Sequence, residues 1–301
     1  MNMTQPLVSI CCITYNHELY IKKAIEGFLM QKTTFPIEII IHDDASTDKT
    51  AEIIKGYADQ NPNVIVSILQ IENQYSKGLG FIHKFVYSRA RGKYFAVCEG
   101  DDYWTDPLKL QKQVDFLEKN PGYDLVYGNQ LHLELNGQYY PYIPPKILSF
   151  EDLLKQNSIP TATTCFRKTS YDKYRLETNQ ISDNWLLGDY PLWLWICQSS
   201  KIKHLNDFYA IYRRHEGSAT DFGNFDKGEL FFLSVIDIKT YYYSYYNGRL
   251  TLNSFIKREH SSLFTLSIKY HKLLKSIKYF PYNPLENVIY ISKLISHKVF
   301  K

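Results

Sequence analysis

The first 120 residues alternate between apolar, β-rich segments and amphipathic segments with helical spacing. The predicted strands and helices, in chain order, are 7–14, 18–31, 37–41, 49–59, 64–69, 81–90, 94–98 and 108–119. Strands that alternate with helices in this way form a mostly parallel sheet with helices on both faces. The sequence therefore predicts an α/β protein with a Rossmann-like central sheet.

Beyond residue 120 the predicted elements are shorter and less regular. Asn136-Gly137 is a hairpin-turn signal, and Pro141, Pro144 and Pro145 predict a loop after it. The remaining predicted strands are 124–127, 131–140, 161–167 and 208–213, and the predicted helices are 150–156 and 190–200. From residue 225 onward we expect a helical region rich in Tyr and Lys.

The composition is that of a globular protein. A hydrophobic content of 45% allows a sizeable core, and no apolar run approaches the ~18 residues of a membrane span. The five cysteines lack the spacing of a metal site and lie mostly in apolar segments, so we expect reduced core residues. Because the N-terminus shows no signal-peptide pattern, we expect a cytoplasmic protein, without a nucleic-acid partner.

The charge is concentrated toward the C-terminus. Residues 226–301 hold 12 Lys and Arg against 5 Asp and Glu. An apolar stripe accompanies these lysines and consists of Leu263, Leu266, Tyr270, Leu273, Leu274 and Ile277. Either the stripe packs on the rest of the protein, or it lies on an anionic membrane surface. Peripheral contact with the inner face of a membrane, through these basic helices, is thus one expectation.

Polar clusters follow three of the predicted strands. They are Thr14-Tyr15-Asn16, Asp43-Asp44-Ala45-Ser46-Thr47-Asp48 and Glu99-Gly100-Asp101-Asp102. In open α/β sheets, ligands bind at the carboxyl ends of the strands. The like charges of the third cluster repel one another, and a divalent cation with oxygen ligands is the usual compensation. A solvated acidic turn is the alternative for any one of these clusters.

The same clusters, with Arg91-Gly92-Lys93-Tyr94 leading into the third, resemble the inverting family 2 glycosyltransferases of the GT-A fold. The resemblance covers roughly residues 7–220. It implies a catalytic domain at 1–225, with a nucleotide-sugar-binding half at 1–120 and an acceptor half at 121–225, followed by the helical region at 226–301. The implied activity is transfer of a sugar from a nucleotide-diphosphate sugar, UDP-linked by preference, to a saccharide or lipid-linked acceptor.

The resemblance also implies a donor site at the strand ends. The residues implied to contact the donor are Thr14, Tyr15, Asp43, Asp44, Lys77, Glu99, Asp101 and Trp104. The family's Asp-x-Asp signature aligns with Glu99-Gly100-Asp101, so its first position is Glu here. For Lys77 the alternative is a solvated loop lysine, and for Trp104 it is a core position at the start of a helix.

A divalent metal, Mn or Mg, is implied by the same resemblance. The implied ligands are Asp101, Asp102 and His215, and carboxylate oxygens suit either ion. The ion would neutralise the charge of the diphosphate leaving group. Arg213 or Arg214, just before His215, are candidates for a phosphate contact.

An inverting transfer needs a base for the acceptor hydroxyl, and the resemblance implies Asp189 for this role. Asp189 precedes the apolar, Trp-rich helix predicted at 190–200, and partial shielding from water would raise its pKa toward a useful value. A plain helix N-cap is the alternative, and Asp183 is a second candidate for the base.

Two other classes of protein remain open from the sequence. A non-catalytic nucleotide-sugar-binding protein on the same fold would explain the Glu at position 99. A receiver-like phosphoacceptor domain could bind Mg through Asp43 and Asp44, but the chain is long for such a domain and carries a second acidic cluster.

Overall fold

A computed structural model describes residues 5–78, 80–147, 149–178, 185–216, 218 and 222–279. The chain divides into two compact units. The first comprises Met1–Leu148, Ser158–Asn184 and Gly188–His215, and the second comprises Ser149–Asn157, Trp185–Leu187 and Glu216–Lys301.

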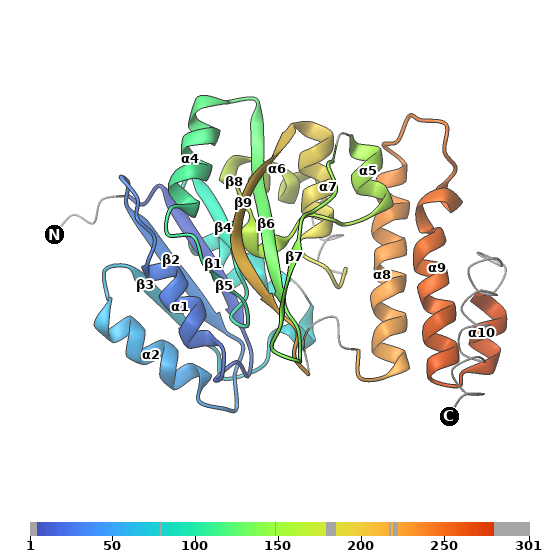
Figure 1. The fold of residues 1–301 in the computed structure, drawn as a ribbon, viewed down its shortest axis with the longest axis horizontal. Helices are drawn as coiled ribbons and strands as arrows, with labels where there is room; N and C mark the ends of the chain where they lie inside the picture. Colours follow the sequence, from blue (N-terminus) through green and yellow to red (C-terminus); the bar gives the residue numbers. More distant parts are fainter. Residues whose placement is uncertain are drawn as a thin grey trace. The chain divides into compact units, whose positions relative to one another are not determined.

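The first unit begins with the alternation that the sequence predicts (Figure 1). Its elements are β1 (Val8–Thr14), α1 (Ile21–Leu29), β2 (Ile37–Asp43), α2 (Thr50–Gln60), β3 (Ile65–Leu69), α3 (Gly80–Phe85), β4 (Tyr94–Val97), β5 (Tyr103–Trp104) and α4 (Lys109–Lys119). Strand β1 pairs in parallel with β2 and β4, and β2 pairs in parallel with β3. The helix predicted at 81–90 is shorter and continues as a 3₁₀ turn at Tyr87–Arg89.

The rest of the first unit extends this sheet with mixed pairing. Its elements are β6 (Tyr123–Leu133), β7 (Tyr139–Tyr142), β8 (Cys165–Arg167), α6 (Lys168–Thr178), α7 (Tyr190–Ser199) and β9 (Lys201–Arg213). The strand order is β3-β2-β1-β4-β8-β6-β9-β5, with β7 on β6. Strand β8 is antiparallel to both β4 and β6, whereas β6 and β9 are parallel. The sheet is therefore parallel in its first half and mixed in its second.

Several predicted boundaries in this second half are wrong. The strands predicted at 124–127 and 131–140 are one strand, β6, followed by the hairpin turn and β7. The strand predicted at 161–167 begins as a 3₁₀ turn, Thr161–Thr163. Pro141 lies within β7 instead of a loop. A proline is tolerated there because β7 is an edge strand: it pairs with β6 on one side, and on the other side no strand of the described sheet needs an N–H donor from Pro141.

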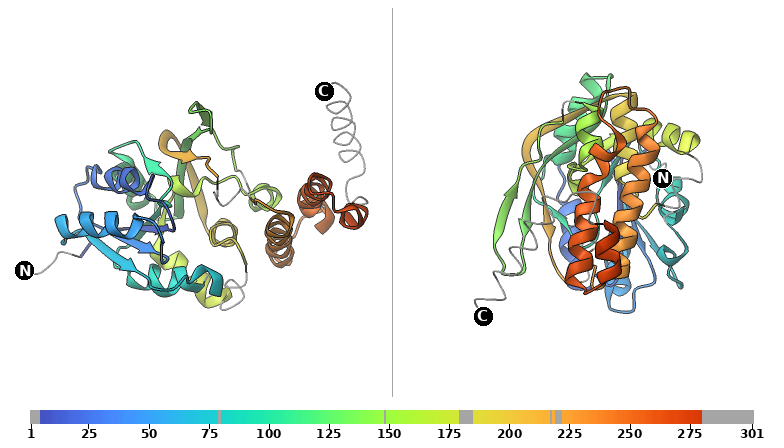
Figure 2. Two further views of the ribbon diagram at one scale, coloured as in Figure 1. Left: turned by 90° about the horizontal axis from the view of Figure 1, so that it is seen from below. Right: turned by 90° about the vertical axis from the view of Figure 1, so that its right-hand side faces the viewer.

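Helices cover both faces of the sheet in the first unit. On one face Ile10, Cys12 and Ile41 are buried in one hydrophobic cluster with Phe28 of α1 and Leu110 of α4. Figure 2 (left) shows α1 and α2 on one side of the strands and the teal and yellow-green helices α3 and α6 on the other. All five cysteines are free and four of them are buried, as expected for reduced core residues.

The opposite face is covered by aromatic rings. Phe95 of β4 stacks on Tyr87, with ring centroids 5.2 Å apart, and meets Tyr171 of α6 edge-on at 5.9 Å. Phe166 of β8 packs against Phe95 and against Trp193 of α7. With both faces buried, the carboxyl edge of the strands is where the first unit can bind a ligand.

The second unit is helical where the structure describes it, which agrees with the helical C-terminal region that the sequence predicts. Its helices are α5 (Phe150–Lys155), α8 (Phe225–Tyr243), α9 (Leu252–Lys269) and α10 (Leu273–Tyr279), and α8 to α10 lie side by side in Figure 2 (right). The buried Lys239 ammonium donates to the carbonyls of Lys155 and Phe255 and to the Glu259 carboxylate, each at 2.8 Å. This one side chain thus connects α5, α8 and α9. No helix in the described ranges has both the length and the apolar character needed to cross a membrane.

Candidate active site

Three strand ends of the first unit meet at one edge of the sheet. Thr14, the last residue of β1, pairs in register with Asp43 of β2, and the Asp44 N–H donates to the Thr14 carbonyl at 3.0 Å. The Gly100 N–H donates to the carbonyl of Ile13 at 2.9 Å. A Cβ on Gly100 would lie 2.6 Å from the Thr14 hydroxyl oxygen, so only glycine permits this approach. The structure therefore brings together the three polar clusters that the sequence predicts.

The turn after β2 is held by hydrogen bonds to its own carboxylates. Asp43 accepts from the Ser46 N–H at 3.0 Å and from the Ser46 hydroxyl. Asp44 accepts from the N–H groups of Gln74 at 2.7 Å and Tyr75 at 2.9 Å, which ties the loop after β3 to the turn. Burial raises the pKa of Asp43, and the Ser46 hydrogen bonds oppose that rise. Asp44 thus organises the neighbouring loop, while Tyr15 presents a half-exposed ring at the same edge.

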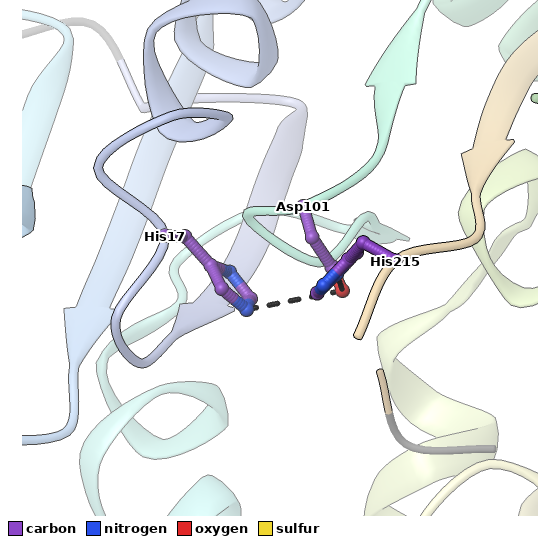
Figure 3. Close-up of side chains that lie close together, drawn as sticks. All are labelled: His17, Asp101 and His215. Carbon is purple, nitrogen blue, oxygen red and sulfur yellow. Dashed lines mark hydrogen bonds and ion pairs between the residues drawn. The ribbon is translucent and has the colours of Figure 1, made fainter. Parts of the chain in front are cut away.

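His17, Asp101 and His215 converge at this edge (Figure 3). They follow β1, β4 and β9 respectively. Asp101 Oδ2 lies 3.0 Å from His215 Nε2 and 3.8 Å from His17 Nε2, and the three ligand atoms all lie within 4.8 Å of one another. Asp101 is buried, and its Oδ1 atom has no hydrogen-bond partner among the described residues. The cluster therefore has the form of a cation site.

The electrostatics of the cluster couple the protonation states of the carboxylate and the imidazoles. Burial lowers the pKa of His17, against the opposing charge of Asp101. Burial alone would raise the pKa of Asp101, but the hydrogen bond with His215 and the charges of both imidazoles hold that pKa below its usual value. A neutral imidazole and an ionised carboxylate are the forms that bind a metal ion.

The donor set indicates which ion fits. Two imidazole nitrogens and one carboxylate suit a divalent transition-metal ion, whereas Mg²⁺ is held mainly by oxygen ligands. A bound ion would also satisfy the buried Oδ1 of Asp101. His17 was not predicted as a site residue. Its sequence signal is weak, a single histidine three residues beyond the end of β1.

Asp102, which the resemblance implies as a ligand, lies outside this cluster. Its Oδ1 accepts from the backbone N–H of Arg213 at 2.9 Å. Burial, together with the charge of Asp101, raises the pKa of Asp102 well above its ordinary value, which disfavours the ionised form. The guanidinium of Arg213 donates to the Asp101 carbonyl at 2.6 Å, and Arg214 approaches Glu134 at 3.5 Å. Both arginine side chains therefore have protein partners, and the phosphate contact expected of either one stays a prediction.

Trp104 is a buried core residue, the alternative left open for it in the sequence, and this placement does not fit the expected contact with the donor. Its indole N–H donates to the Ala162 carbonyl at 2.7 Å, Phe28 packs edge-on against the ring, and the Lys109 ammonium lies 4.1 Å from the ring centroid. A ring enclosed in this way presents no face to a ligand. Lys77 forms an exposed ion pair with Glu72 at 2.9 Å, which agrees with the alternative interpretation of a solvated loop lysine.

Asp189 lies at the N-terminus of α7, where it both caps the helix and approaches the site. Its Oδ1 accepts from the Tyr190 N–H at 2.6 Å, and its Oδ2 accepts from the Thr161 hydroxyl. Burial, followed by the charges of Asp101 and Asp189, raises the pKa of Glu99 to about 8. Glu99 is thus within electrostatic reach of both the cation cluster and the candidate base. Asp183, the other candidate base, lies outside the described residues.

Comparison with known proteins identifies relatives of this chain. Residues 9–175 match the model of Glycosyl transferase family 2. An uncharacterized protein of Mycobacterium tuberculosis is 40% identical over 213 residues, which cover 69% of this chain and 59% of that protein. The chain therefore spans about three fifths of the length of this relative. The Escherichia coli UDP-Glc:alpha-D-GlcNAc-diphosphoundecaprenol beta-1,3-glucosyltransferase WfaP is 32% identical over 219 residues, covering 71% of this chain and 80% of WfaP.

Solved structures share the fold. TarS 1-349 of S. aureus, in complex with UDP-GlcNAc, has a TM-score of 0.58 and 18% identity over 91% of this chain and 79% of that one. The mannosyltransferase PcManGT of Pyrobaculum calidifontis, in complex with GDP-Man and Mn²⁺, has a TM-score of 0.57 and 14% identity over 97% of this chain and 87% of that one. The fold is therefore the GT-A fold that the sequence predicts. With the match over more than half its length, the chain belongs to glycosyl transferase family 2.

Proposed function

We propose that this chain is a metal-dependent, inverting glycosyltransferase that moves a sugar from a UDP-linked donor to a saccharide or lipid-linked acceptor. The observation that carries the proposal is the convergence of His17, Asp101 and His215 beside the turn at Asp43, with Glu99 within electrostatic reach of both Asp101 and Asp189. Relatives support the donor and the acceptor: WfaP is named for UDP-Glc and a lipid-diphosphate-linked sugar, and TarS was solved with UDP-GlcNAc.

The donor nucleotide would occupy the edge formed by β1 and β2. The half-exposed ring of Tyr15 can stack on the uracil base, and the Asp43 carboxylate can accept from its N3–H. The Thr14 hydroxyl is buried at the same edge without a hydrogen-bond partner among the described residues. It could therefore form a hydrogen bond with an oxygen of the nucleotide sugar. Asp44 would act indirectly, by holding the loop that carries Tyr75.

His17, Asp101 and His215 would hold the divalent ion, and we propose Mn²⁺ over Mg²⁺ because of the two imidazoles. The ion, when bound, would supply positive charge to the diphosphate leaving group. PcManGT, solved with Mn²⁺, has the same fold and supports this choice.

Asp189 would act as the general base on the acceptor hydroxyl. As the acceptor oxygen bonds to the anomeric carbon and the bond from that carbon to the diphosphate oxygen breaks, the hydroxyl proton passes to the Asp189 carboxylate. The Thr161 hydroxyl and the Tyr190 N–H orient this carboxylate. Inversion then follows from attack on the face opposite the leaving group.

Calorimetric titration of UDP into the full chain tests the proposal. With Mn²⁺ we expect UDP to bind about tenfold to a hundredfold more tightly than in EDTA, the usual range for two ligands that are coupled at one site. Mg²⁺ should have a smaller effect, and GDP should bind more weakly than UDP. UDP affinity that is the same in Mn²⁺ and EDTA would contradict the metal assignment. Release of UDP from a UDP-sugar then distinguishes an enzyme from a binding protein.

We also propose that α10 contacts an anionic membrane, where lipid-linked acceptors reside. Leu274 and Ile277 are 84% and 63% exposed and lie on one face of the helix, three residues apart. Lys272 and Lys278 are exposed on either side of them. The apolar stripe predicted from the sequence is thus divided, because Leu263 and Leu266 are buried in the second unit. Exposed apolar side chains flanked by lysines match the surface of an anionic bilayer.

Sedimentation with lipid vesicles tests this contact. The full chain should bind vesicles of equal parts phosphatidylglycerol and phosphatidylcholine, and bind pure phosphatidylcholine poorly. Leu274→Glu and Ile277→Glu should each weaken that binding about tenfold, because each removes the burial of one apolar side chain. Leu176→Glu is the matched control, since Leu176 is 82% exposed on α6 of the other unit. Equal losses in all three variants would refute a specific role for α10.

A further inference from the structure

Arg213 ends β9 two residues before His215 and contacts Asp101 and Asp102 in the loop after β4. Its backbone N–H donates to Asp102 Oδ1 at 2.9 Å, and its guanidinium donates to the Asp101 carbonyl at 2.6 Å. Arg213 is almost fully buried. The bonds join segments that lie more than 110 residues apart in the sequence. One residue therefore connects the strand that leads to His215 with the loop that carries Asp101.

Two tyrosine rings lie against this guanidinium. It lies 4.4 Å from the ring centroid of Tyr103 and 5.2 Å from that of Tyr20. The Tyr20 ring in turn lies 4.6 Å from the His215 ring. The aromatic contacts restrict the guanidinium to the orientation in which it reaches the Asp101 carbonyl.

We propose that Arg213 and Asp102 are positioning residues that hold Asp101 and His215 in cation-binding geometry, without touching the ion themselves. The inference rests on the proposed metal-dependent function and adds two residues to it. We refer to the pair of hydrogen bonds from Arg213 to Asp101 and Asp102 as the clasp. Asp102 is thereby assigned a role different from the ligand that the sequence suggested.

The physical argument concerns the two loops that carry the ligands. Asp101 and His215 both lie just beyond the ends of strands, so strand pairing alone does not fix their side chains. Without the guanidinium, the Asp101 carbonyl would lose its charged donor, and the backbone around Asp101 would be free to shift. Loss of such an outer partner typically weakens metal binding about tenfold to a hundredfold.

Substitutions at Asp102 distinguish a role in the clasp from a role as a metal ligand. The clasp needs only an oxygen that accepts from the Arg213 N–H, and asparagine retains that oxygen. A metal ligand would need the carboxylate charge, which asparagine lacks. Asp102→Asn should therefore be tolerated if Asp102 is part of the clasp, and Asp102→Leu should not.

The experiment is a titration of Mn²⁺ into the full chain at fixed pH, with the free-ion signal followed by electron paramagnetic resonance. We expect Arg213→Met and Asp102→Leu to raise the Mn²⁺ Kd about tenfold or more, and Asp102→Asn to change it about threefold at most. Arg213→Lys, which keeps a cationic donor but loses the planar stack, should fall between wild type and Arg213→Met. Arg214→Met is the matched control, because Arg214 is half-exposed and only approaches Glu134.

Each outcome decides the proposal. It is overturned if Asp102→Asn weakens Mn²⁺ binding as much as Asp102→Leu, because Asp102 would then be a ligand. It is also overturned if Arg213→Met behaves like Arg214→Met while the wild type binds Mn²⁺ tightly. A wild type that binds no Mn²⁺ would refute both the proposed metal and the clasp, whereas the two outcomes above would refute the clasp alone. UDP affinity in EDTA and the Tm show whether each variant is folded. If Arg213→Met does not fold, the Mn²⁺ Kd values of Arg213→Lys and Asp102→Asn decide the proposal.

Discussion

Replacement of Asp189 by asparagine is expected to lower the kcat of sugar transfer about a thousandfold, within the range that a general base contributes. Asparagine has nearly the same shape and retains an oxygen that can accept from the Tyr190 N–H, so the start of α7 should be preserved. It cannot take a proton from the acceptor hydroxyl. Because Asp189 is not among the proposed metal ligands, Mn²⁺-dependent UDP affinity should stay close to that of the wild type.

The measurement pairs the initial rate of UDP release, with donor and acceptor present, with calorimetry of UDP binding. Asp226→Asn is a suitable control, since Asp226 is an exposed acid in the first turn of α8. If Asp189→Asn keeps a large fraction of the wild-type kcat, another residue is the general base, and Asp183 would be tested next. Equal losses of affinity and rate would instead indicate that Asp189 binds substrate.

Replacement of Asp101 by asparagine should abolish the effect of Mn²⁺ on UDP affinity and lower turnover on the order of a thousandfold, since charge stabilisation by a metal ion amounts to several kcal/mol. Asp101 Oδ2 is the atom that both His17 and His215 approach, and it is the only anionic ligand of the cluster. Asparagine removes that charge with little change in volume. Affinity for UDP in EDTA should therefore change little.

The two variants should differ in kind as well as in size. Asp189→Asn should lose turnover but bind Mn²⁺, whereas Asp101→Asn should lose both. Asp102→Asn is a close control for the second variant, because Asp102 is a buried acid in the same loop. If UDP binding by Asp101→Asn still strengthens with Mn²⁺, the ion binds elsewhere and the proposed cluster is structural.

The first half of the fold could be predicted closely because its signals are local. Buried strands such as β1 and β2 are continuous apolar runs, and α1 shows its apolar face at helical spacing. The second half was harder because tertiary contacts override the local pattern there. The sequence predicts a break at 128–130 between two strands, yet Asn129 is buried within β6, where its side chain donates to the Asn206 carbonyl and bonds to His204. Helix α6 was missed since it is largely polar, with Tyr171 and Tyr174 among its few buried residues.

The candidate site residues also fall into two groups, those that local signals predict and those whose partners depend on tertiary contacts. Thr14, Asp43 and Asp101 were predicted because each comes at the end of a strand, and parallel strands bring their ends to one edge. Trp104 and Asp102 lie next to these positions but have other partners, the protein core and the Arg213 N–H. Adjacency in the sequence does not separate these cases, because neighbouring side chains along an extended chain point in different directions.

The sequence by itself determined the α/β order, the edge of the sheet that carries polar chemistry, and the family resemblance. These features depend on residues a few positions apart, where spacing and side-chain type suffice. Only the tertiary structure decided that His17 joins Asp101 and His215, and that the Arg213 guanidinium donates to the Asp101 carbonyl. The reason is that Asp101 and Arg213 lie 112 residues apart in the chain. Their meeting depends on how β9 pairs with β5 and β6, which no local pattern encodes.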